Sequence, residues 1–181
     1  MDKADIVVTH NGDMFDIPKI NSRFVINGMP PTTPYYSVDT CKISKKYFGF
    51  SSNKLDALAS YFGFKHKLDT DFNLWKCCME GSVAALNYME EYNKQDVILL
   101  EEVYLKLRPW IKGHPNVGNF MDDNIVRCSC CGSNKVFEVK DKFYYTSVGK
   151  YPLYQCSECG GVSRGRKTIK ENKVELISVG R

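Results

Sequence analysis

The stretch His10-Asn-Gly-Asp-Met-Phe-Asp-Ile-Pro18 decides how the first part of this 181-residue chain is interpreted. The residues before it, Asp5 to His10, are mostly β-branched and predict a short strand. Asn-Gly predicts a turn, and Pro18 is suited to the first turn of a following helix. Asp16 is therefore expected just beyond the C-terminal end of a strand, where open α/β sheets bind ligands.

Apolar periodicity downstream predicts several helices and a second short strand. The strand is expected at 35–39, and helices are expected at 16–27, 40–48, 53–62, 72–79 and 82–107. The helix at 72–79 is expected to carry Phe72, Trp75 and Cys78 or Met79 inward. The last helix has the strongest pattern, because apolar residues recur three and four apart at Val97, Leu100, Val103, Tyr104 and Leu107. Together these elements predict an α/β domain over residues 1–110.

The rest of the chain has a different character. Residues 111–126 are rich in turn-forming residues and are interpreted as a linker. Residues 127–181 form a second domain with β character, in which strands are expected at 135–139, 143–148, 151–155 and 173–179. Charge divides at the same point, since residues 1–126 hold 14 Lys/Arg and 16 Asp/Glu, whereas residues 127–181 hold 11 and 5. A segment with a net charge of +6 favours an anionic partner such as nucleic acid.

Composition excludes two broad classes of protein. A hydrophobic content of 43% and an aromatic content of 13% exclude a disordered chain. No apolar run approaches the roughly 20 residues that a membrane-spanning helix needs. The N-terminus has no signal-peptide pattern, so a cytoplasmic protein without a membrane partner is expected.

The cysteines of the second domain indicate a metal site. Cys128-Ser-Cys-Cys131-Gly132 and Cys156-Ser-Glu-Cys159-Gly160 both fit the form Cys-x-x-Cys-Gly. A two-residue gap lets both sulfurs of one turn reach a zinc ion at about 2.3 Å, and the following glycine permits a positive φ. Two such turns predict a zinc ribbon, whose metal supplies much of the stability of so small a unit. The expected ligands are Cys128, Cys131, Cys156 and Cys159.

Other residues of this domain have more than one interpretation. Cys130 could compete with a neighbouring ligand, but it is taken as a bystander. Arg164, Arg166 and Lys167 are candidate contacts to nucleic-acid phosphates, with nearby tyrosines available to stack on bases. The alternative is a structural ribbon with a solvated basic face. Cysteines without partner spacing are expected to be buried, inert thiols, namely Cys41, Cys77 and Cys78.

Carboxylates of the first domain suggest a second kind of metal site. Phosphodiester cleavage by two metal ions requires several carboxylates that converge from different elements. Tyr92 and Asp96 are four residues apart on an expected helix and so share a face, and Asp16 could meet them. Each pattern also has a structural explanation, because an aspartate at a helix start is commonly an N-cap and a tyrosine on an amphipathic helix is commonly part of the core. His10 is expected to be a hydrogen-bonding support.

These motifs resemble a known family. Asn11-x-x-x-Phe15-Asp16 and Tyr92-x-x-x-Asp96 are similar to the second and third motifs of DEDDy-type 3′–5′ exonucleases. That group belongs to the RNase H-like superfamily and includes the proofreading domains of family B DNA polymerases. Its phage-type and YprB-like members read similarly around His10-Asn-Gly, Val38-Asp39-Thr40, Lys54-Leu-Asp56 and the helix that carries Tyr92. The resemblance covers about residues 3–110. It implies a bacteriophage origin and host cytoplasm as the compartment.

The resemblance also implies roles for individual residues. Asp16 and Asp96 would bind Mg²⁺ or Mn²⁺ in a two-metal site, and Tyr92 would position the attacking water. Asn11 and Phe15 would contact the 3′-terminal nucleotides of single-stranded DNA. Asp39 could be a further acid or, as the favoured alternative, a cap at the end of its strand.

The sequence departs from the family pattern in one respect. The first motif of the family, Asp-x-Glu on the first strand, does not precede Asn11. The strands that normally carry it are missing with it, which would leave a sheet edge unpaired. A second chain is therefore expected to supply these N-terminal strands and the Asp-x-Glu motif. The first hypothesis is thus a 3′–5′ exonuclease or a subunit of one. The alternatives are a catalytically inactive nucleic-acid-binding or accessory protein, and a purely structural zinc module.

Overall fold

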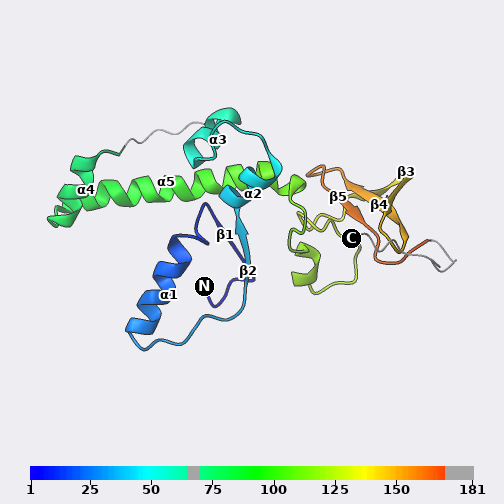
Figure 1. Cartoon of the computed structure of the whole chain (residues 1–181), viewed down its shortest axis with the longest axis horizontal. Helices are drawn as coiled ribbons and strands as arrows, with labels where there is room; N and C mark the ends of the chain where they lie inside the picture. The colour runs from blue at the N-terminus through cyan, green and yellow to red at the C-terminus, as the bar shows by residue number, and fades with distance from the viewer. Residues whose placement is uncertain (65–69, 170–181) are drawn as a thin grey trace, which may run out of the picture. The chain divides into compact units, whose positions relative to one another are not determined.

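The computed structural model describes residues 1–64 and 70–169 of the chain (Figure 1). It divides into two compact units, Met1–Leu107 and a second unit that begins at Arg108. Among the described residues, no helix combines the length and the apolar character that crossing a bilayer requires.

The first unit is a mixed α/β structure. Its elements are β1 (Ile6–Thr9), α1 (Asp16–Ile26), β2 (Tyr36–Asp39), α2 (Thr40–Tyr47), α3 (Leu55–Tyr61), α4 (Phe72–Met79) and α5 (Val83–Leu107). The helices and both strands expected from the sequence are therefore confirmed to within a few residues. β1 and β2 pair in parallel, with Ile6 opposite Tyr36 and Thr9 opposite Asp39. The carboxyl ends of both strands consequently meet at one edge of the sheet.

The core of this unit lies between α3 and α5. Its fully buried side chains are one cluster, and partly buried phenylalanines from the loops around α3 surround it. α2 and α4 also pack against α5. The buried cluster consists of Leu58, Ala59, Leu99, Val103 and Leu107.

The predicted inner face of α4 is mostly wrong. Phe72, Trp75 and Met79 are 84%, 56% and 88% exposed, respectively. Leu74, Cys77 and Cys78 are instead half-buried, and they share the side of the helix that packs on α5. A helix of eight residues with apolar groups on two faces gives no periodic signal that distinguishes them.

The face of α5 is also corrected at one position. Val97 is 60% exposed, whereas Leu99 is 3% exposed and lies in line with Val103 and Leu107 at a spacing of four. Neighbouring Ile98 is 58% exposed. The apolar residues of α5 thus exceed what the described part of the chain covers.

The second unit is built on an antiparallel sheet. Two short 3-10 helices, η1 (Arg108–Trp110) and η2 (Val117–Phe120), precede the strands β3 (Val136–Tyr145), β4 (Lys150–Cys156) and β5 (Val162–Arg164), which lie in the order β3-β4-β5. The two strands expected at 135–139 and 143–148 are one strand with an irregular register between Glu138 and Phe143. β5 was not predicted, because three residues are too short for a periodic pattern. The strand expected at 173–179 lies outside the described residues.

Candidate active site and metal centre

Asp39, the last residue of β2, holds the turn that follows β1. Asp39 is only 4% exposed, and its carboxylate accepts hydrogen bonds from the backbone amides of Asn11 (2.8 Å) and Asp13 (3.3 Å). It also accepts from the amides of Cys41 and Lys42 at the start of α2, at 3.0 and 3.2 Å. Four amide donors satisfy this buried carboxylate, so the structure supports the cap and not the further acid.

The turn itself depends on its Asn-Gly pair. Asn11 has a φ of 63°, a left-handed conformation that asparagine tolerates better than most residues. A Cβ atom on Gly12 would lie 2.5 Å from the Cβ of Thr9, so only glycine fits this close approach to β1. The predicted turn is confirmed, and it places Asn11 at the carboxyl edge of the sheet.

Asp16 and Phe15 are presented to solvent after this turn. α1 begins at Asp16 with Phe15 in the N-cap position, so Asp16 is not the N-cap that the structural alternative required. The ring of Phe15 is 54% exposed and lies 4.1 Å from the Nζ of Lys19. Both predicted residues are therefore accessible to a ligand.

Asp13, which precedes both residues in the turn, already has side-chain partners. Its carboxylate accepts hydrogen bonds from Ser37 Oγ at 2.5 Å and from Lys42 Nζ at 2.9 Å. Burial raises the pKa of Asp13, but the bonds from Ser37 and Lys42 outweigh burial and lower its pKa below the ordinary value. Asp13 is thus an anion that braces the turn against β2 and α2.

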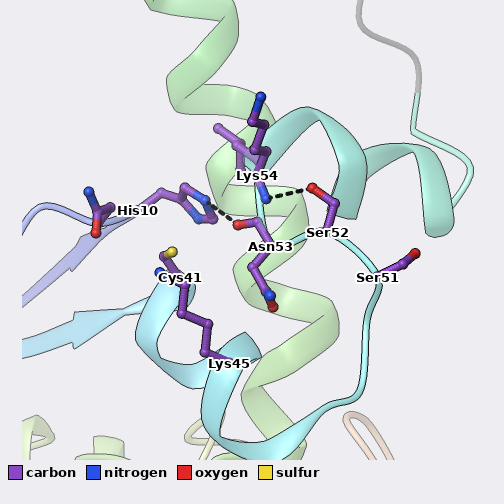
Figure 2. Close-up of a pocket in the computed structure, with 9 residues that line it drawn as sticks. His10, Cys41, Lys45, Ser51, Ser52, Asn53 and Lys54 are labelled. Atoms are coloured by element: carbon purple, nitrogen blue, oxygen red, sulfur yellow. Dashed lines mark hydrogen bonds between the residues drawn. The ribbon is translucent and has the colours of Figure 1, made fainter.

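His10 connects three segments, and Figure 2 shows its bond to Asn53. Its Nδ1 lies 2.9 Å from Thr40 Oγ1, and its Nε2 lies 3.0 Å from the carbonyl oxygen of Asn53. A carbonyl can only accept, so Nε2 carries a proton in this geometry. Burial lowers the pKa of His10, while the bond to Asn53 partly opposes this effect. The expected supporting role of His10 fits these contacts.

A pocket of about 470 Å³ opens beside His10 and Asn11. Its other walls come from α2 and from the loop before α3, which contribute Lys45, Asn53 and Lys54 (Figure 2). Both lysines are exposed. The pocket is therefore polar and positively charged, and it lies at the carboxyl edge of the parallel strands.

Tyr92 and Asp96 lie together on α5. Burial, followed by the negative charge of Asp96, raises the pKa of Tyr92 above its ordinary value. The Tyr92 hydroxyl is in hydrogen-bonding reach of both Asp96 and Thr70, and Asp56 on α3 adds a weaker electrostatic effect. The four-residue spacing predicted this pair. The approach of Asp56 was missed, although the Lys54-Leu-Asp56 motif was a sequence signal for it.

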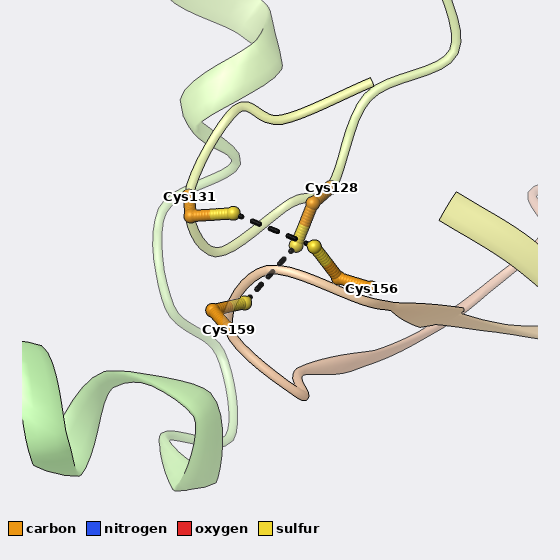
Figure 3. A group of neighbouring side chains, drawn as sticks. All are labelled: Cys128, Cys131, Cys156 and Cys159. Carbon is orange, nitrogen blue, oxygen red and sulfur yellow. Dashed lines mark hydrogen bonds between the residues drawn. The ribbon is translucent and has the colours of Figure 1, made fainter. Parts of the chain in front are cut away.

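The cysteine turns of the second unit face each other (Figure 3). The Sγ atoms of Cys128 and Cys159 lie 3.6 Å apart, as do those of Cys131 and Cys156, and all four lie within 4.8 Å of one another. Sulfurs about 2.3 Å from a tetrahedral zinc ion are about 3.8 Å apart, whereas a disulfide needs about 2 Å. The arrangement fits the four ligands of a metal ion.

The backbone of each turn supports this fit. Gly132 and Gly160 have φ values of 75° and 73°, as the motif predicted. The amide of Gly132 donates to the carbonyl of Cys128, and the amide of Gly160 donates to that of Cys156, so the turns have the same internal bond. Cys130 is 5% exposed and is not one of the four grouped sulfurs, which is the arrangement expected of a bystander.

Basic and aromatic side chains contact each other on the sheet of this unit. The guanidinium of Arg164 lies 4.4 Å from the ring centre of Tyr151 and 5.7 Å from that of Tyr144. Arg166 and Lys167 are exposed and border a second pocket, next to Tyr154. The three predicted cations thus lie in one short stretch, with Arg164 at the end of β5 and Arg166 and Lys167 just after it. The latter two have no aromatic partner among the described contacts.

Comparison with known proteins identifies the first unit. A family model of the RNase H superfamily matches residues 1–108, which is more than half of the chain. The chain belongs to the RNase H superfamily. No curated protein and no solved structure matches it significantly. The match coincides with the first compact unit, which is called the RNase H-like unit below.

The RNase H-like unit assembles only part of the predicted carboxylate site. Tyr92 and Asp96 lie together on α5 and Tyr92 senses the charge of Asp56 on the packed helix α3, whereas Asp16 is on α1, which is not among the helices that pack extensively on α5. Within residues 1–64 and 70–169, the cysteine cluster is the only group of three or more Asp, Glu, His or Cys side chains close enough to hold a metal ion. The described carboxylates do not complete a two-metal site by themselves.

Proposed function

We propose that this chain is part of a 3′–5′ exonuclease that removes nucleotides from single-stranded DNA ends by metal-dependent hydrolysis. The observation that carries the proposal is the Tyr92–Asp96 pair on α5, in a unit that belongs to the RNase H superfamily. RNase H-like nucleases use divalent metal ions, which stabilise the charge that develops on the phosphate. The oxygen ligands that such ions prefer are available at Asp16 and Asp96.

The chemistry of Tyr92 is consistent with positioning a water molecule. Because burial and Asp96 raise its pKa, the phenol keeps its proton at neutral pH. A neutral phenol can donate or accept a hydrogen bond, but it does not remove a proton from water. Tyr92 would therefore orient the attacking water, while Asp96 holds Mg²⁺ or Mn²⁺.

The carboxyl edge of the sheet is suited to the rest of the substrate. The exposed ring of Phe15 and the side chain of Asn11 would contact the terminal nucleotides. The pocket beside them offers Lys45 and Lys54 to the phosphate backbone. The strand would thus meet positive charge where Lys45 and Lys54 line the pocket, and bound metal ions would neutralise Asp16 and Asp96.

A second chain would complete the site. In the described part, β1 and β2 pair only with each other, so each presents an unpaired edge. Large apolar side chains of the same unit are also exposed, including Val25 (79%), Ile26 (72%) and Val97 (60%). A partner that adds strands to this sheet and covers these residues could bring the Asp-x-Glu carboxylates next to Asp96.

A catalytically inactive nucleic-acid-binding protein is the alternative. It is favoured by the absence of a carboxylate cluster among the described residues and by the basic character of the cysteine-containing unit. The two functions differ in one measurement, the release of labelled nucleotides from the 3′ end of a single strand with Mg²⁺ or Mn²⁺. Release that depends on Asp96 supports the exonuclease, and tight binding without release supports the alternative. Parallel DNA and RNA strands identify the substrate.

A further inference from the structure

The second unit contains a pocket of about 420 Å³ that is separate from the cysteine cluster. Its floor is one face of the sheet, where Tyr154 lies opposite Ser163 and two residues from Pro152 on the same strand. Val126 and Val136 add apolar walls. The volume is in the range of about 300–1,000 Å³ that is typical of small-ligand sites.

The segment that closes the pocket is held tightly against β4. A Cβ atom on Gly165 would lie 2.8 Å from Pro152 Cγ and 3.6 Å from a ring carbon of Tyr154. The amide of Gly165 donates to the carbonyl of Pro152 at 2.9 Å. This close approach fixes the residues that follow, Arg166 and Lys167, at the rim of the pocket.

The charges at the rim are not neutralised. Neither Arg166 nor Lys167 forms an ion pair with any residue that the structure describes. Arg127, which also borders the pocket, is bound to Asp123 and to the carbonyl of Gly132. Arg164 also borders the pocket, but it pairs across the sheet with Leu153 and its guanidinium lies over the ring of Tyr151, so its charge already has an aromatic partner. The pocket therefore combines an apolar floor, one aromatic ring and two available cations.

We propose that this pocket binds one nucleobase of a single-stranded nucleic acid. The base would lie on Tyr154 and Pro152, and the phosphates on either side of it would contact Arg166 and Lys167. A ligand that joins a planar apolar group to flanking negative charges satisfies both features of the pocket. Stacking of this kind tolerates any base, since every base has a π-face. The inference rests on the proposed function in that the bound strand is the substrate of the RNase H-like unit.

The test compares two strands of equal charge. Fluorescence anisotropy of the full-length zinc-loaded chain, without Mg²⁺ or Mn²⁺, measures the affinity for a short thymidine oligonucleotide and for an oligonucleotide of the same length with abasic sites throughout. One stacked base contributes about 1–3 kcal/mol, so the wild-type chain is expected to bind the thymidine strand about 5- to 150-fold more tightly. Tyr154→Ser should abolish most of this preference for the thymidine strand over the abasic strand. The matched control, Tyr145→Ser, changes a 66%-exposed tyrosine that does not line the pocket. This variant should retain the preference for the thymidine strand.

A second variant tests the cations independently of the sheet. Arg166→Gln combined with Lys167→Gln changes only exposed side chains, so folding and zinc content should be unaffected. It should weaken binding of both strands equally. It should also reduce the magnitude of the slope of log K against log salt concentration by about 1.4, because each neutralised phosphate of a single strand contributes about 0.7.

Three results would contradict the proposal that the pocket binds a base. They are equal wild-type affinities for the two strands, an unchanged ratio in a folded Tyr154→Ser chain, and an equal loss in Tyr145→Ser. The test of the pocket is independent of the test of the proposed exonuclease, because it measures binding under conditions without hydrolysis. A chain that binds bases through Tyr154 but never releases nucleotides refutes the exonuclease alone, and an active exonuclease without a base preference refutes the pocket alone.

Discussion

The carboxylate of Asp39 accepts a hydrogen bond of 2.8 Å from the backbone amide of Asn11, so the end of β2 is tied directly to the turn that follows β1. The same carboxylate caps α2. One buried side chain thereby fixes the edge of the sheet at which Asn11, Phe15 and Asp16 are presented. The candidate site depends on this residue for its shape, although Asp39 itself is committed to backbone amides.

Removal of this carboxylate should destabilise the RNase H-like unit. Asp39→Ala leaves several amides of a buried site without acceptors, so we expect a loss of about 2–4 kcal/mol in the free energy of unfolding. Asp71→Ala is the matched control, because Asp71 caps α4 at an exposed site and its loss should cost about 1 kcal/mol. Urea unfolding followed by circular dichroism measures both. An effect of Asp39→Ala no larger than that of Asp71→Ala would show that the turn is held by other contacts.

Gly12 provides a test of the turn itself. Gly12→Ala forces a methyl group to within 2.5 Å of Thr9, and overpacking of this kind costs about 1–3 kcal/mol. Gly49→Ala is the control, since a Cβ atom there meets nothing within 4 Å. It should be neutral or stabilise the unit by up to about 1 kcal/mol. Thermal unfolding of both variants separates the two outcomes, and equal melting temperatures would contradict the close approach of Gly12 to β1.

The metal centre predicts a difference between neighbouring cysteines. The wild-type chain should bind one zinc ion, and Cys156→Ser should lose it together with the structure of the β unit, because zinc stabilises such small units. Cys130→Ser should keep the ion, since Cys130 is buried outside the group of four sulfurs. Metal analysis, and the absorption spectrum of the Co²⁺-substituted chain, report the ligands. Loss of metal from Cys130→Ser with retention in Cys156→Ser would reverse the assignment.

His10 should make the RNase H-like unit sensitive to acid. Burial lowers its pKa below 6.5, so the unfolded chain binds a proton more readily than the folded chain. The free energy of unfolding should therefore fall as the pH drops below about 6.5 and level off below the folded pKa. Amide hydrogen exchange in β1 and β2 follows this unit by itself. The dependence should disappear in His10→Gln, and an NMR titration midpoint for His10 above 6.5 would contradict the account.

The sequence predicted the parts of the fold that local patterns control. The turn at Asn11-Gly12 and the two cysteine turns were found because turn chemistry and ligand spacing are local. The exposed sides of Phe72 and Val97 were not found, since periodicity marks an apolar face without showing what covers it. Asp56 and Lys54 were missed as site residues because their approach to Tyr92 and to the pocket depends on how α3 packs against α5.

The central claim concerns Asp96 and is tested on the chain with its natural partners. Tagged wild-type, Asp96→Asn and Glu102→Gln chains are purified from the source cells, and each is incubated with a 3′-labelled single strand of DNA and Mn²⁺. Glu102 is the matched control because it is an exposed carboxylate on the same helix. The wild-type and Glu102→Gln preparations should release mononucleotides at equal rates, and Asp96→Asn should be slower by at least about 100-fold, since a metal ligand is lost. No release by the wild-type preparation, or equal release by Asp96→Asn, would contradict the proposed exonuclease.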